Sequence, residues 1–134
     1  MTRNEEVKKY FDELLRFTSD QAQEIIPDNF TYETGYSNGM VFLEIQGPRL
    51  GPFLFALGGE IAEVKYDGKF HSFVPLGHDD EGEELKEFLQ EALVDLVRFI
   101  ESDQQFTEQK TLLFRKNCFR IQLSDQNLVL IQRR

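Results

Sequence analysis

Apolar and small residues recur at helical spacing along the first part of the chain. They share one face of a helix and comprise Val7, Tyr10, Phe11, Leu14, Thr18, Ala22 and Ile25. Thr2, followed three residues later by Glu5, forms a capping-box pattern that starts a helix. Pro27 ends this helix or its last irregular turn. The pattern predicts an amphipathic N-terminal helix that lies on a sheet.

Beyond Pro27 the period of the pattern changes to two, which is typical of strands. Alternating segments flank Asn38-Gly39, and both of these residues tolerate the positive φ that a type I′ hairpin turn requires. A two-residue loop places Glu33 opposite Glu44 and gathers the apolar positions on the other face: Tyr32, Thr34, Tyr36, Val41, Leu43 and Ile45. Further turns at Gly58-Gly59 and Asp67-Gly68 predict about five antiparallel strands over residues 30–75.

The stretch GYSNG at residues 35–39 matches the G-x-S-x-G nucleophile elbow of serine hydrolases. That elbow needs a helix directly after the serine, whereas the following MVFLEIQ alternates as a strand. We therefore interpret Ser37 as a turn residue.

A second helical stripe covers residues 79–102 and contains Leu85, Phe88, Leu89, Ala92, Leu93, Leu96, Val97 and Ile100. Asp80 with Glu83 is a candidate capping pair. Three strand-like segments follow at 110–116, 117–123 and 128–134, with a turn expected at residues 124–127. If Lys116-Asn117 is also a turn, Phe114 and Phe119 lie opposite each other as core residues.

The order of these elements predicts one α+β domain over residues 1–134. It has an N-terminal helix, an antiparallel meander of about five strands, an amphipathic acidic helix and about three C-terminal strands. Several strands are apolar on both faces: Phe53, Phe55 and Leu57 fall on one face, and Leu54, Ala56 and Ile61 on the other. Such a sheet needs cover on both sides, from helices or from a partner.

Charge narrows the range of partners. The chain carries a net charge of −9, and residues 79–105 hold ten Asp and Glu against two Lys and Arg. Such a surface repels nucleic acid and anionic membrane and favours a basic protein partner. The sequence contains no apolar run long enough to cross a membrane and no secretory signal pattern at its start. Cys118 is the only cysteine, so a cytoplasmic location is expected.

The candidate partner-binding residues fall into three groups. Glu33 and Glu44 lie opposite each other in the predicted hairpin, and like charges in that position favour a positive group between them. Arg49 lies in an exposed Pro/Gly loop, and arginine is enriched at interaction hot spots. The third group is the acidic face of the second helix, with Glu84, Glu87, Glu91 and Asp95.

His71, His78 and Asp79 are the candidate metal ligands, because imidazole and carboxylate groups suit zinc, manganese or iron. Their spacing matches no recognised ligand pattern, and the carboxylates already serve the start of a helix. We therefore expect no cofactor, and we interpret His71 as a residue satisfied by a hydrogen bond.

A basic and aromatic stretch, FRKNCFR, covers residues 114–120. Its Arg115, Lys116 and Arg120 have the character of a nucleic-acid contact, but the net charge of the chain argues against that function. No catalytic motif surrounds Cys118, which is interpreted as a structural or surface thiol.

Together these patterns favour a non-catalytic, acidic protein-binding module that engages a basic protein partner. In size, charge and layout the chain resembles bacterial immunity proteins and secretion chaperones, although it shares no motif with them. The resemblance implies a toxin-neutralising role or a chaperone role, and the chaperone role would require a homodimer. The alternative is a small metal-dependent or small-molecule enzyme that uses the His71/His78/Asp79 and Glu33/Glu44 groups.

Overall fold

A computed structural model of the chain describes residues 2–50, 52–58, 60–76, 82–102, 109–110 and 117–132. The predicted α+β order is confirmed. A helix, five strands, a second helix and three further strands follow one another as α1 (Arg3–Ile25), β1 (Thr31–Ser37), β2 (Met40–Gln46), β3 (Phe53–Gly58), β4 (Ile61–Tyr66), β5 (Phe70–Pro75), α2 (Glu83–Glu101), β6 (Gln109–Lys110), β7 (Asn117–Leu123) and β8 (Gln126–Gln132).

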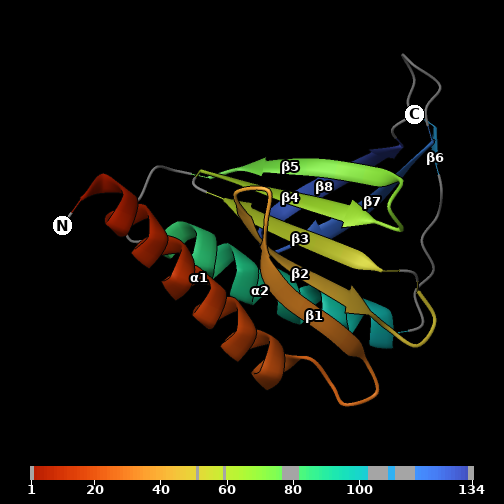
Figure 1. Cartoon of the computed structure of the whole chain (residues 1–134). Coiled ribbons are helices and arrows are strands. Elements are labelled where there is room, and N and C mark those ends of the chain that lie inside the picture. The colour runs from red at the N-terminus through yellow and green to blue at the C-terminus, as the bar shows by residue number, and fades with distance from the viewer. Residues whose placement is uncertain are drawn as a thin grey trace.

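All eight strands form a single antiparallel sheet in the order β1-β2-β3-β4-β5-β8-β7-β6. The meander is consecutive as far as β5. The last strand, β8, then pairs with β5, and β7 lies outside it. Both helices cover the same face of this sheet (Figure 1).

The core lies between the helices and that face. From α1 it takes Leu14, Thr18 and Ala22, and from α2 it takes the whole predicted stripe. Alternate residues of the strands complete it, and Phe53 and Phe55 of β3 are fully buried there. The buried Thr18 hydroxyl is satisfied, because it donates to the carbonyl oxygen of Leu14 at 2.8 Å. The apolar residues at helical spacing and the alternating apolar residues of the strands therefore pack into one core.

Two predicted local signals are confirmed. The Thr2 side chain accepts from the Glu5 backbone N–H, and the Glu5 carboxylate accepts from the Thr2 N–H, both at 3.3 Å. At the first hairpin Asn38 has φ 56° and Gly39 has φ 76°, as a type I′ turn requires. Ser37 belongs to β1 and pairs with Met40, and β2 follows directly in place of the helix that a nucleophile elbow needs.

The start of α2 differs from the prediction. The helix begins at Glu83, its N-cap is Gly82 and no side chain caps it, so Glu83 does not stand as the third residue of a capping box. Gly82 has φ +71°, and a Cβ there would lie 3.0 Å from the Tyr10 hydroxyl oxygen. A left-handed backbone beside another side chain selects glycine at this position. Asp80 lies outside the described residues.

Three predicted turns are also placed differently. Gly58 pairs with Ile61, so β3 continues one residue into the expected turn. The predicted strand 117–123 is confirmed as β7, and Asn117 pairs with Lys110, so Asn117 is a strand residue and not part of a turn. Residues 111–116 of the predicted strand 110–116 lie outside the described residues. The turn between β7 and β8 has only two residues, Ser124 and Asp125, because β8 begins at Gln126.

Candidate functional site

The sheet face that points away from the helices carries several exposed apolar side chains among polar ones. The register places Phe73, Ile61 and Ile131 on this face, and their exposed fractions are 46%, 38% and 38%. Half-buried Phe42, Leu54 and Val129 share the same face. We call this surface the open face. We expected both faces of the sheet to be covered. Within the described part of the chain, the helices cover one face and leave the open face uncovered.

The aromatic ring of Phe42 lies on the neighbouring strand. A Cβ at Gly35, directly opposite in β1, would be 2.8 Å from two atoms of this ring. Glycine therefore allows Phe42 to lie flat against β1, and the apolar surface extends toward that edge of the sheet.

A small charged cluster lies in the middle of the open face. The His71 ring nitrogen Nδ1 is 3.1 Å from Glu63 Oε1, and Lys65 Nζ is 3.5 Å from the same oxygen. The His71 and Glu63 side chains are only 12% and 15% exposed. The prediction that a hydrogen bond satisfies His71 is confirmed. A carboxylate that holds an imidazole in this way fixes its orientation, which is one element of acid–base chemistry.

Glu33 and Glu44 lie opposite each other, as predicted, and both are exposed on the β1–β2 margin of the open face. Strands β3 and β4 separate Glu44 from His71, a span of about 14 Å at the usual strand spacing. The residues of the enzyme alternative therefore do not form one site, and its other members, His78 and Asp79, lie outside the described residues. In the ranges that the structure describes, no group of three or more His, Cys, Asp and Glu side chains could hold a metal ion.

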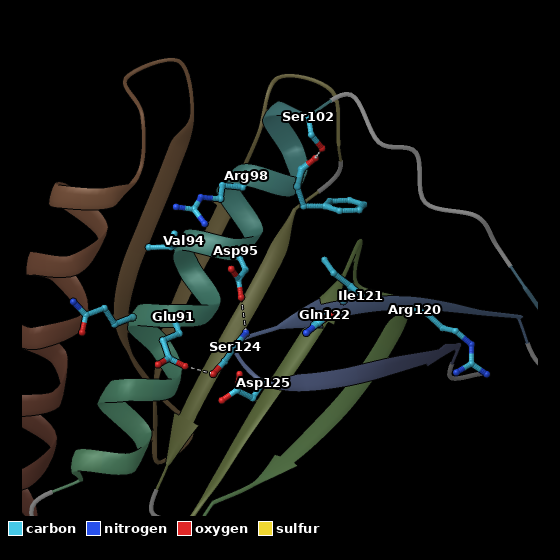
Figure 2. A pocket seen from close by; sticks show the side chains of 12 residues that line it. Glu91, Val94, Asp95, Arg98, Ser102, Arg120, Ile121, Gln122, Ser124 and Asp125 are labelled. Atoms are coloured by element: carbon cyan, nitrogen blue, oxygen red, sulfur yellow. Dashed lines mark hydrogen bonds between the residues drawn. The ribbon is translucent and has the colours of Figure 1, made fainter.

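A groove of about 910 Å³ runs beside α2, between this helix and the β7–β8 end of the sheet (Figure 2). Three carboxylates line it, from Glu91, Asp95 and Asp125, and Arg98 lies further along α2. Figure 2 shows Glu91 and Asp95 directed from the helix toward the β7–β8 turn. The Ser124 backbone N–H donates to Asp95 Oδ2 at 2.8 Å, and the Ser124 hydroxyl donates to Glu91 Oε2.

The predicted acidic face of α2 is thus a real surface. Glu84, Glu87 and Glu91 are exposed and Asp95 is half-buried at the groove wall. We call these four residues, with Asp125, the acidic flank. Sequence reasoning missed Ser124, which is 29 and 33 residues from its partners Asp95 and Glu91, and Asp125, which lines the same groove. The four-residue spacing of Glu91 and Asp95 was the only local signal for this arrangement.

The remaining candidates lie elsewhere. Arg49 is exposed and lines a separate hollow of about 290 Å³ with Ile100 and Glu101, near the C-terminal end of α2. Cys118 is buried, so it is not a surface thiol. Arg120 of β7 is the exception, because it lines the same groove as the acidic residues of α2, with its side chain extending away from the helix (Figure 2). Arg115 and Lys116 lie outside the described residues.

Comparison of the chain with family models, with curated proteins and with solved structures finds no match. Neither described helix is long and apolar enough to cross a membrane. Any function must therefore be argued from the surfaces themselves.

Proposed function

We propose that this protein is a non-catalytic binding module that engages a basic protein partner through the acidic flank. The observation that carries the proposal is the meeting of Glu91, Asp95 and Asp125 around one groove of about 910 Å³. The exposed Glu84 and Glu87 continue the same negative surface along α2 toward its N-terminus.

The groove carboxylates are held in place before any partner arrives. Hydrogen bonds from Ser124 fix both Glu91 and Asp95, so these side chains lose little conformational freedom on binding. Each ionised carboxylate can accept several hydrogen bonds, so acceptor capacity remains for a Lys or Arg side chain. A preorganised acceptor set is a better interaction site than a mobile acidic surface.

The overall charge acts in the same direction. A net charge of −9 attracts basic proteins over distances of about a Debye length and raises the rate of encounter. Arg98, further along the groove, can donate hydrogen bonds to an acceptor group of the partner. A donor beside the carboxylates favours one orientation of the bound partner. A toxin-neutralising or chaperone role in the bacterial cytoplasm is the more specific form of this proposal.

Charge reversal with a matched control tests the proposal. The partner is first captured on the tagged protein at low salt, and its affinity for each variant is then measured by calorimetry. Glu87→Lys should weaken binding by at least about fivefold, because it places a positive charge beside the groove. Glu24→Lys makes the same change on the exposed side of α1 and should alter affinity by less than about twofold. Equal effects of the two variants would mean that only net charge matters, and would contradict the proposed site.

The second candidate function is a small-molecule or metal-dependent enzyme centred on His71, which the Glu63 hydrogen bond favours. Its test is a calorimetric titration of the full chain with Zn²⁺ and with Mn²⁺. We expect no heat above background. A saturable signal in the wild type that is lost in His71→Ala would support the enzyme over the binding module.

A further inference from the structure

The open face carries apolar side chains on both sides of the central Glu63, His71 and Lys65 cluster. Phe42, Ala56, Glu63 and Phe73 follow one another across β2, β3, β4 and β5 in directly paired positions. Ile61 lies on the same side, opposite Pro75. Three of the six large hydrophobic residues exposed in the described chain lie on this face: Ile61, Phe73 and Ile131. An exposed group of this kind marks an interaction surface.

The size of the open face suits a stable contact between two protein chains. Seven paired strands of six or seven residues present roughly 600 Å² of flat surface at the usual strand spacing and rise. Burying such a face against an equal one removes about 1,200 Å² from solvent in total. That area is at the lower limit for specific, stable interfaces.

Charges are distributed unequally over the two ends of the open face. Glu33 and Glu44 lie on β1 and β2 at one end. At the other end the open-face positions of β7 and β8 that the structure describes include no carboxylate and carry Arg120. A twofold axis parallel to the strands reverses the strand order of the second copy, so the acidic end of each copy meets the Arg120 end of the other. A twofold axis perpendicular to the strands would stack the acidic ends on each other.

We propose that a second copy of this chain covers the open face, with the two sheets stacked about a twofold axis parallel to the strands. Centred on β4, this arrangement places the ring of Phe73 over Ala56 of the second copy, where the small side chain leaves room for it. The cost of burying the central charges is reduced, because Glu63 is already paired with His71 and Lys65 within each copy. Sheets stacked in this way cross at about −30° because each is twisted.

This dimer leaves the carboxylates of the proposed partner site exposed, although Arg120 belongs both to the edge of the open face and to the lining of the groove. The helices lie on the opposite side of each sheet, so both acidic flanks remain outward in the dimer (Figure 1). A dimer would present two equivalent flanks to basic partners.

Sedimentation equilibrium of the full chain, over a range of concentrations, tests the proposal. The wild type should have twice the mass of one chain, with a dissociation constant of roughly micromolar order. Phe73→Glu should raise that constant by at least about thirtyfold, because it places a charge at the centre of the interface. Tyr32→Glu is the matched control, since Tyr32 is an aromatic strand residue of similar exposure, 43%, on the helix side of β1. It should leave the constant unchanged.

Charge exchange tests the direction of the axis. Glu33→Lys and Arg120→Glu should each weaken the dimer by about two- to fivefold, and the double variant should recover most of the loss. Circular dichroism and thermal unfolding verify that every variant is folded. A monomeric wild type, a dimer that survives Phe73→Glu but is lost in Tyr32→Glu, or a double variant weaker than either single one would each overturn the proposal.

Discussion

Substitution of Asp95 tests the hydrogen bonds that join α2 to the β7–β8 turn. Asp95 is half-buried, and its Oδ2 accepts the backbone N–H of Ser124 at 2.8 Å. Ser124 has φ 56°, a left-handed conformation that is unusual for serine, and this hydrogen bond helps to hold it. Asp95→Ala removes the acceptor and leaves the N–H without this partner.

The expected cost follows from the charge and the burial of this hydrogen bond. Hydrogen bonds to charged groups contribute about 1.5–3 kcal/mol, and partial exposure places this one at the lower end. We therefore expect Asp95→Ala to lower the free energy of unfolding by about 1.5–2 kcal/mol, which lowers Tm by roughly 5–7 °C for a chain of this size. Asp95→Asn keeps an acceptor oxygen in the same place without the charge, so it should cost about half as much.

Urea and thermal unfolding of the three proteins measure these differences. If Asp95→Ala changes the free energy of unfolding by less than about 0.5 kcal/mol, or by no more than Asp95→Asn does, the carboxylate does not hold the turn. Asp95 would then not be preorganised for binding at the groove.

Two further predictions concern the framework around the groove. Gly82→Ala should destabilise the protein by more than Gly39→Ala. Both residues have positive φ, which costs about 1–2 kcal/mol for alanine, but only at Gly82 would the new Cβ lie 3.0 Å from the Tyr10 hydroxyl oxygen. Equal losses of stability in denaturant unfolding would show that Tyr10 moves aside freely. Leu93→Ala, at a fully buried position of α2, should cost about 3 kcal/mol, whereas Gln90→Ala on the exposed side of the same helix should change stability by less than about 0.5 kcal/mol. Similar losses in these two variants would contradict the packing of α2 against the sheet.

The elements that the sequence predicted well are those governed by neighbouring residues. The capping box of Thr2 and Glu5 lies within one helical turn, and Asn38-Gly39 determines both its own turn and the pairing of Glu33 with Glu44. The apolar stripe of α2 is confirmed residue by residue, because helical spacing alone determines which side chains share a face.

The elements that it predicted poorly depend on distant contacts. The turn at Ser124, which is tighter than expected, is bonded to carboxylates of α2, and Tyr10 lies close to Gly82 at the shifted start of α2. The insertion of β8 between β5 and β7 has no local signal. The acidic residues of α2 were identified in advance, but the groove was not, since it exists only where residues 120–125 meet the helix.

Carboxyl footprinting of the complex with the captured basic partner shows which carboxylates the partner covers. The labelling of each exposed Asp and Glu by a carbodiimide and an amine is compared by mass spectrometry with and without the partner. Binding at the acidic flank predicts that labelling falls at Glu84, Glu87 and Glu91 and stays the same at Glu24 on α1. Unchanged labelling along α2, or an equal fall at Glu24, would contradict the claim that this flank is the binding site.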